Sequence, residues 1–215
     1  MTVVDRDLLA ALRTVELPTL GHFLEDGFCD QRVASVNQVT QMVGIARTLD
    51  LQEPDALAVN RAVLALTPGD VLVIRVEGGQ HAPVGAVTAA AAFARGAAGI
   101  VVDGPVTDII ALREWAPRLP IFATGLTART TKRLGSLDDR VLDAVIDVGG
   151  VQVHPGDWML GDPHGILVLP PDGPGRDVLH QALASDAAEP ALLARIAAAE
   201  PLESLLLTNL PPITP

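Results

Sequence analysis

The chain has 215 residues, which is enough for one large domain that buries a core without disulfide bonds. Its formal net charge of -11 and its single lysine, Lys132, disfavour nucleic acid as a ligand, because binding to a polyanion requires clustered basic side chains. The only cysteine, Cys29, fits a reducing compartment, and the N-terminus lacks the pattern of a signal peptide. No stretch predicts a membrane span, so we expect a cytoplasmic protein that binds neither nucleic acid nor membrane.

The first 66 residues are predicted to be helical, with loops between the helices. Apolar residues recur at helical spacing after Asp5, and residues 18–28 look like a short helix that Gly27 closes. An amphipathic helix over residues 53–66 begins near a Pro-Asp pair and stops before the turn sequence TPGD. We therefore assign residues 1–66 as the helical N-terminal part of a domain that spans residues 1–180.

The middle of the chain has the pattern of an α/β unit. A strand over residues 67–79, an alanine-rich helix over 85–99 and a strand over 100–104 follow one another. This succession predicts a parallel pair of strands with its functional loops at their carboxyl ends. A helix over residues 107–119 and a short strand over 120–125 repeat the unit.

After residue 136 the pattern changes to strands joined by short turns, because β-branched residues alternate with Gly, Pro and Asp. Residues 181–215 are predicted to form a helical arm with a proline-rich tail. The alanine and leucine faces of this arm would be exposed on an isolated domain, so we expect the arm to pack on the core or on a neighbouring subunit.

The loop between the first strand of the unit and its helix is a candidate binding site. Gly78, Gly79 and Gly85 allow close approach of the backbone, and the amides from Gly85 to Thr88 would lie at a helix N-terminus, which suits an anion. The loop lacks G-x-G-x-x-G spacing and a lysine, so it is neither a dinucleotide fingerprint nor a Walker loop. His81 lies in this loop and could face the site. The alternative is a glycine turn that only connects two elements.

A second candidate follows the strand over residues 100–104, where the sequence reads DGPVTD. Asp108 lies at or near the start of the next helix, so it could be a helix cap or an acid of the first turn. It could also be a ligand for a hard divalent cation, which needs few carboxylates when waters complete its shell. The position beside the glycine loop favours the cation ligand. The histidines show no H-E-x-x-H motif, which argues against a zinc protease.

In their order and spacing, three segments resemble the RraA-like superfamily, which contains the regulator of ribonuclease activity A and class II 4-hydroxy-4-methyl-2-oxoglutarate aldolases. The segments are PGDVLVIRVEGG, VGAVTAAAAFARGAAGIVVDGPVTDIIALREWAPRLPIFATGLTAR and VQVHPGDWMLGDPHGILVLP. The resemblance implies an α/β fold, a swivelling β/β/α three-layer domain, to which this chain adds N-terminal helices and a C-terminal helical arm. It also implies a ring-shaped homotrimer or homohexamer with sites between subunits.

The resemblance further implies a metal-dependent site. In the aldolase members, an acid in the glycine loop is followed by twenty residues and then Arg-Asp. The final Asp holds Mg²⁺ or Mn²⁺, the Arg holds the carboxylate of the pyruvate moiety, and the metal stabilises the enolate that carbon–carbon cleavage releases. In this sequence the final Asp is Asp108, but Thr107 stands at the Arg position and Ala86 at the position of the loop acid. Thr124 stands where relatives often have a further arginine.

The loss of the arginine changes what the site can bind. An Arg–carboxylate contact contributes about 1.5–3 kcal/mol, or more when it is desolvated. Thr107 can offer one neutral hydrogen bond and no charge. A carboxylate substrate would therefore need Arg75, Arg113 or Arg129 to reach the site from elsewhere.

Three hypotheses remain open from the sequence. The first is a divergent lyase of aldolase or decarboxylase type, dependent on Mg²⁺ or Mn²⁺, that acts through an enolate on a small, less anionic 2-oxo or β-keto substrate. Asp108 would hold the metal and act in catalysis with Thr107 and His81. The substrate-binding residues would be Gly85, Ala86, Val87, Thr88, Thr107 and Thr124.

The second hypothesis is a non-catalytic regulatory ring whose acidic surface suits a basic protein partner. The third is a structural relic or a partner subunit of an active paralogue.

Overall fold

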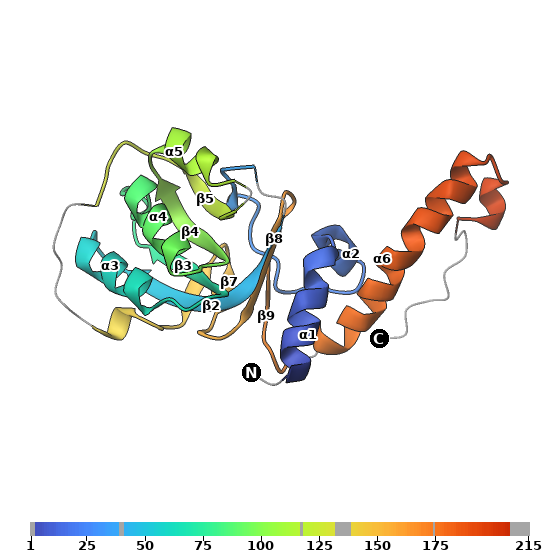
Figure 1. Cartoon of the computed structure of the whole chain (residues 1–215), viewed down its shortest axis with the longest axis horizontal. Coiled ribbons are helices and arrows are strands. Elements are labelled where there is room, and N and C mark those ends of the chain that lie inside the picture. The colour runs from blue at the N-terminus through green and yellow to red at the C-terminus, as the bar shows by residue number, and fades with distance from the viewer. Residues whose placement is uncertain (1–2, 39–40, 117, 132–138, 174, 207–215) are drawn as a thin grey trace.

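The computed structural model describes residues 3–38, 41–116, 118–131, 139–173 and 175–206 (Figure 1). The α-helices are α1 (Val3–Ala11), α2 (Leu17–Gly21), α3 (Ala56–Ala65), α4 (Ala86–Ala94), α5 (Ile109–Glu114) and α6 (Gly175–Ala197). The strands are β1 (Ala34–Ser35), β2 (Met42–Leu51), β3 (Asp70–Val76), β4 (Gly99–Val106), β5 (Ile121–Leu126), β6 (Ile146–Val148), β7 (Val151–Val153), β8 (Trp158–Asp162) and β9 (Gly165–Leu169). Short 3-10 helices are η1 (Leu12–Thr14), η2 (Asp139–Val141) and η3 (Leu202–Ser204).

A seven-stranded sheet in the order β1-β5-β4-β3-β2-β8-β9 forms the centre of the fold. Strands β2 to β5 run parallel to their neighbours among themselves, whereas β1, β8 and β9 pair antiparallel at the two edges. Helices α3, α4 and α5 cover one face, and the β6–β7 hairpin packs on the other (Figure 1). The β/β/α three-layer architecture implied by the resemblance is therefore confirmed, as is the parallel β3–α4–β4 unit.

The two faces of the sheet belong to two separate cores. On β3, Leu72 and Ile74 point toward the helices, whereas Val71 and Val73 point toward the hairpin. All four side chains are fully buried, and burying each contributes about 1.5–3 kcal/mol. Parallel strands with both faces covered have continuous apolar sequences, which is why the sequence VLVI was a clear strand signal.

The central strand β2 was not predicted, and the assignment of residues 1–66 as helical is wrong for this segment. Polar side chains, Arg47, Thr48 and Asp50, interrupt its apolar residues and hide the strand pattern. Each of them has a partner, because Thr48 donates to a backbone carbonyl and the other two form ion pairs. The helix expected over residues 18–28 also differs, since α2 ends at Gly21.

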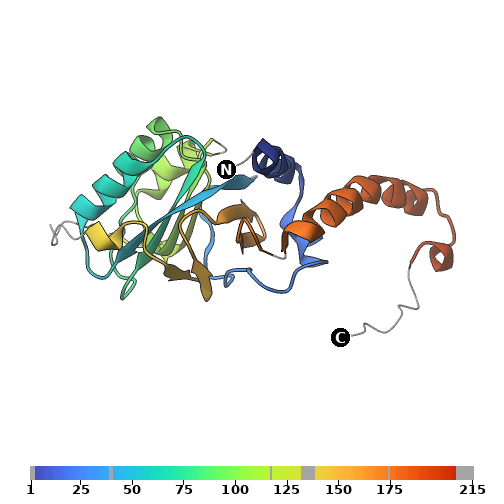
Figure 2. The same cartoon turned by 90° about the horizontal axis from the view of Figure 1, so that it is seen from below.

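The C-terminal arm begins earlier than the expected boundary at residue 180, because α6 is one continuous helix across it. Leu179 and Ala182 near its start are buried against the N-terminal helices, and the Thr19 hydroxyl donates to Asp186 at 3.2 Å. Beyond this point the arm extends away from the body (Figures 1 and 2). Across the part of the chain that the structure describes, the search for a helix able to cross a membrane found none.

Candidate functional site

The carboxyl ends of the parallel strands adjoin two pockets, one on each side of the sheet, in the region where open α/β sheets bind ligands. We call them the hydroxyl pocket, on the helix side, and the ion-pair pocket, on the hairpin side. Their volumes are about 190 Å³ and about 430 Å³. The hydroxyl pocket is lined by Ala56, Val59, Asn60, Ala82, Pro83, Gly85, Val87, Thr88, Thr107, Asp108, Thr130 and Thr131.

Threonines supply most of the neutral polar residues that line the hydroxyl pocket. Thr88, Thr107, Thr130 and Thr131 lie on three separate segments of the chain, and Asn60 joins them from α3. The Thr88 hydroxyl also donates to the Pro83 carbonyl at 3.4 Å. Asp108 is the one charged side chain among the described residues that line it. The pocket can therefore offer hydrogen bonds to carbonyl and hydroxyl groups, but it offers no positive side chain to a carboxylate.

Asp108 is held against the glycine loop. It adopts a left-handed conformation, with φ 53° and ψ 39°, and one of its carboxylate oxygens, Oδ2, accepts the Ala86 N–H at 3.0 Å. Gly85 makes this approach possible, because a Cβ there would lie 2.5 Å from the same oxygen. The Thr107 N–H, which donates to the Val84 carbonyl at 3.0 Å, ties the two loops together. Asp108 is the N-cap residue of α5, but its side chain hydrogen-bonds to the first amide of α4 instead. That amide was expected to bind a ligand anion.

This arrangement limits the metal that the site could hold. Within the described ranges, no group of three or more His, Cys, Asp or Glu side chains is placed to hold a metal ion. Asp108 alone supplies a carboxylate, and one of its oxygens already accepts an amide hydrogen. Mg²⁺ is often bound by one or two carboxylates while waters and substrate oxygens complete its shell. The residues therefore fit a weakly held Mg²⁺ or Mn²⁺ whose other ligands are water and substrate.

Most of the predicted substrate-binding residues come together in the hydroxyl pocket. Gly85, Val87, Thr88 and Thr107 line it directly. Ala86 does not line it, but its N–H orients the Asp108 carboxylate. Val87 is 84% exposed and lies at the rim. The ends of the glycine loop and of the DGPVTD segment, at Gly85 and at Thr107 and Asp108, thus lie together in this pocket, whereas Gly78 and Gly79 line the ion-pair pocket.

Two predicted site residues lie elsewhere. Thr124 is exposed on β5 and lines the ion-pair pocket, on the opposite side of the sheet. This follows from the alternation of side chains along a strand, because Thr124 has the same orientation as Phe122, which packs in the hairpin-side core. His81 is half-buried in the glycine loop and is absent from the described lining of both pockets.

Thr130 and Thr131 are two of the seven lining residues of the hydroxyl pocket that were missed in the sequence. Their segment reaches the glycine loop through a parallel bridge between Ala82 and Thr130. The Ala82 N–H donates to the Arg129 carbonyl at 2.8 Å, and the Thr131 N–H donates to the Ala82 carbonyl at 3.2 Å. The only sequence signal was the pair of threonines itself, since an isolated bridge between two loops leaves no periodic pattern.

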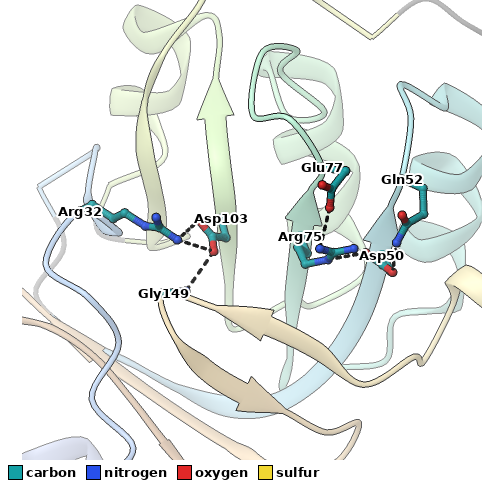
Figure 3. A network of polar contacts seen from close by, with 7 residues as sticks. All are labelled: Arg32, Asp50, Gln52, Arg75, Glu77, Asp103 and Gly149. Atoms are coloured by element: carbon teal, nitrogen blue, oxygen red, sulfur yellow. Dashed lines mark hydrogen bonds and ion pairs between the residues drawn. The ribbon is translucent and has the colours of Figure 1, made fainter.

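The three arginines named above as substitutes for the arginine at position 107 are absent from the described lining of the hydroxyl pocket. Arg75 lies in the ion-pair pocket, where its Nε donates to Asp50 and its Nη1 to Glu77, each at 2.7 Å (Figure 3). The hydrogen bond to Asp50 is the largest cause that raises the pKa of Arg75. Arg113 is exposed on α5, and Arg129 donates to a side chain of the glycine loop.

The ion-pair pocket is built from an aligned row of residues. Asp50, Arg75 and Asp103 are neighbours in register on β2, β3 and β4. Asp103 accepts from Arg32 Nη2 at 3.1 Å and from the Gly149 N–H at 2.9 Å (Figure 3). Both arginines of this pocket are therefore paired with carboxylates of the protein, and the hydrogen bond from Gly149 to Asp103 ties the hairpin to the sheet.

A parallel sheet covered by helices on one face and a hairpin on the other, with a glycine loop beside a single aspartate, is the arrangement that the resemblance to aldolase and RraA proteins implied. The pattern of the RraA-like family, described as Aldolase/RraA, matches residues 4–168, so the chain belongs to that family.

Relatives and solved structures agree with this membership. A protein of Halalkalibacterium halodurans named "Putative 4-hydroxy-4-methyl-2-oxoglutarate aldolase" is 34% identical over 185 residues, 85% of either chain. The 4-hydroxy-4-methyl-2-oxoglutarate aldolase of Thermus thermophilus is 37% identical over 133 residues, which cover 60% of this chain and 76% of that one. RraAS2 of Streptomyces coelicolor, described as an unusual member of the RNase ES inhibitor RraA family, has a TM-score of 0.72 at 25% identity, covering 88% of this chain and 98% of its own.

Proposed function

We propose that this chain is a lyase of aldolase or decarboxylase type that acts on a small 2-oxo or β-keto substrate in the hydroxyl pocket. The names of its relatives support the reaction class. The observation that carries the proposal is the pocket itself, where Asp108 faces four threonines and no cation among the described lining residues. We further propose that the substrate carries less negative charge than a 2-oxo carboxylate such as pyruvate.

The residues of the pocket would bind and orient such a substrate. Thr88, Thr107 and Thr130 would donate or accept hydrogen bonds at its carbonyl and hydroxyl oxygens. When bound through Asp108 and water, Mg²⁺ or Mn²⁺ would supply Lewis-acid polarisation of the 2-oxo group. Ala86 would keep the Asp108 carboxylate in place through its N–H.

The electrostatics of the pocket favour a neutral substrate. In the metal-free pocket, a substrate carboxylate would meet the Asp108 carboxylate with no arginine to offset the repulsion, and two like charges 4 Å apart repel by roughly 4 kcal/mol at an effective dielectric constant of 20. A bound Mg²⁺ or Mn²⁺ would reduce this repulsion, so the preference for a neutral substrate is largest before the metal binds. An ester or amide at the same position would accept hydrogen bonds from the threonines without that cost. Thr107, at the position of the family arginine, would thus change which substrate the pocket prefers and would not simply abolish substrate binding.

Two titrations test this proposal. Calorimetry with Mn²⁺ should show millimolar binding to the wild type and to Asp147→Ala, a control in the other pocket, but none to Asp108→Ala. Absence of binding to the wild type would remove the metal from the proposal. NMR titration should show that methyl pyruvate, a neutral ester, shifts amides of residues 85–88 and 107–108 at lower concentration than pyruvate does; the reverse order would refute a neutral substrate.

We infer a non-catalytic regulatory role as the second candidate. The engagement of Asp108 Oδ2 with the Ala86 N–H supports it, because the carboxylate then has a structural role at the start of α4. The likeness to RraAS2 supports it as well. A wild-type protein that binds neither Mn²⁺ nor either keto compound would favour this role over the lyase, and the net charge of -11 would then suit a basic protein partner.

A further inference from the structure

One wall of the hydroxyl pocket comes from helix α3, which none of the site predictions included. Ala56, Val59 and Asn60 of this helix line the pocket. Ala56 and Asn60 are one helical turn apart, so they lie on the same side of the helix. Val59 is buried, and together with Ala82 and Pro83 it gives the pocket an apolar lining. Helix α3 therefore brings both an apolar surface and one polar side chain to the site.

The packing of α3 holds this wall in a fixed position. Asp55 is the N-cap residue, and its Oδ1 accepts the Leu57 N–H at 2.9 Å and the Ala58 N–H at 3.1 Å. Ala58, Ala62 and Val63 are buried in the core on the helix side of the sheet. Side chains on a capped and packed helix are positioned more precisely than side chains on a loop. The α3 wall is therefore suited to selective recognition of a ligand.

Asn60 is the one nitrogen-bearing side chain among the described residues that line the pocket. It is exposed, and within the described part of the chain its amide group has no hydrogen-bond partner. An asparagine side chain holds a carbonyl acceptor and N–H donors in one plane. A primary carboxamide on a ligand carries the same two groups, so two hydrogen bonds can form between the two amides. An ester or a carboxylate offers acceptors only, and Asn60 can therefore distinguish a carboxamide from both.

Other polar side chains of the pocket also favour a ligand that donates hydrogen bonds. The Asp108 carboxylate can only accept, and its Oδ2 already accepts the Ala86 N–H. The Thr88 hydroxyl donates to the Pro83 carbonyl, so its oxygen is left as an acceptor. We propose that the neutral group of the substrate is a primary carboxamide and that Asn60 is the residue that selects it. This inference rests on the proposed function and deepens it, because it names the neutral group.

Two neutral ligands of similar size, pyruvamide and methyl pyruvate, test the inference by NMR titration. The wild type should bind pyruvamide about fivefold more tightly, since one additional hydrogen bond changes a dissociation constant by roughly that factor. Asn60→Ala removes both hydrogen bonds and should lose most of this preference. Asn60→Asp keeps acceptors but has no donor, so it should weaken the binding of methyl pyruvate more than that of pyruvamide and widen the preference.

A variant on the same helix is the matched control. Leu64→Ala alters an exposed residue of α3 outside the described lining of the pocket and should keep the wild-type preference. Circular dichroism melting of each variant checks that the protein is folded. The ratio of the two affinities is the decisive quantity, because a merely structural role of Asn60 would weaken both ligands alike.

The outcomes separate this inference from the proposed function. If the wild type binds pyruvamide and methyl pyruvate equally, and both more tightly than pyruvate, the neutral substrate stands and the carboxamide is refuted. An Asn60→Ala variant that keeps the full preference would overturn the role of Asn60, as would an Asn60→Asp variant that favours methyl pyruvate. If neither neutral ligand binds more tightly than pyruvate, the neutral substrate of the proposed function fails and the carboxamide fails with it.

Discussion

The two pockets at the carboxyl edge of the sheet differ in the partners of their charged side chains. In the ion-pair pocket, Arg32 and Arg75 are both engaged by carboxylates of the protein itself. In the hydroxyl pocket, the one charged side chain among the described lining residues is Asp108, and its partner is a backbone amide. The larger pocket is therefore mainly a structural junction, whereas the smaller pocket keeps polar groups available for a ligand.

Removing a carboxylate from the ion-pair pocket should have the largest effect on stability. Asp103→Ala leaves Arg32 without its carboxylate and the buried Gly149 N–H without an acceptor. An unsatisfied buried group costs about 1–3 kcal/mol, so we expect urea denaturation to show a loss of about 2 kcal/mol. Asp26→Ala, at an exposed position, should change the free energy of unfolding by roughly 0.5 kcal/mol or less. Equal losses in the two variants would show that the ion-pair row has no structural role.

Placing an arginine at position 107 should have the next largest effect, in this case on the binding of a carboxylate ligand. We expect this effect in the hydroxyl pocket only. Thr107→Arg places a cation beside Asp108, where a charge-assisted contact to a carboxylate contributes about 1.5–3 kcal/mol. We therefore expect pyruvate to bind about tenfold or more tightly by calorimetry, and oxaloacetate decarboxylation to be faster than in the wild type. Thr124→Arg is the matched control, because Thr124 lies on the other side of the sheet. A similar gain from Thr124→Arg would contradict the separation of the two pockets.

Asp108 should contribute less to stability than Asp103, because it is exposed and holds a single amide. Loss of a helix cap costs about 1 kcal/mol, and alanine in the left-handed region adds a similar strain. Asp108→Ala should therefore destabilise the protein by about 1–2 kcal/mol. Asp108→Asn keeps an acceptor and tolerates the left-handed conformation, so its stability should stay near that of the wild type. A large loss in Asp108→Asn would show that the negative charge itself stabilises the loop.

The sequence predicted the parts of the fold that repeat regularly. The buried strands β3 and β4 and the helix between them follow from continuous apolar runs and an alanine-rich segment. Strand β2 escaped prediction because three polar side chains that find partners in the folded protein break its pattern. Local periodicity thus identifies elements whose burial is uniform, and it fails where tertiary contacts satisfy polar groups.

The candidate site, like the fold, was predicted only in part. The loops after β3 and β4 were expected to meet because parallel strands end at one edge, and Asp108 does contact the glycine loop. Thr124 was assigned to this site from the resemblance, because relatives often have an arginine at that position, but alternation along β5 turns it to the opposite face. Thr130 and Thr131 enter through an isolated bridge, for which neither spacing nor composition gives a signal.

The smallest expected effect concerns Cys29, which lies near the acids of the ion-pair pocket. Burial raises the pKa of its thiol from 9.0 to about 12, with smaller contributions from the negative charges of Asp103 and Asp147. Between these two pH values the unfolded chain releases the thiol proton and the folded chain keeps it, so stability should fall as the pH rises through this window. Iodoacetamide should label the folded protein slowly at pH 8 and the urea-unfolded chain quickly. Asp147→Asn removes only the smaller of the two charge contributions, so it should accelerate labelling slightly; fast labelling of the folded wild type would mean that the thiolate forms readily despite burial.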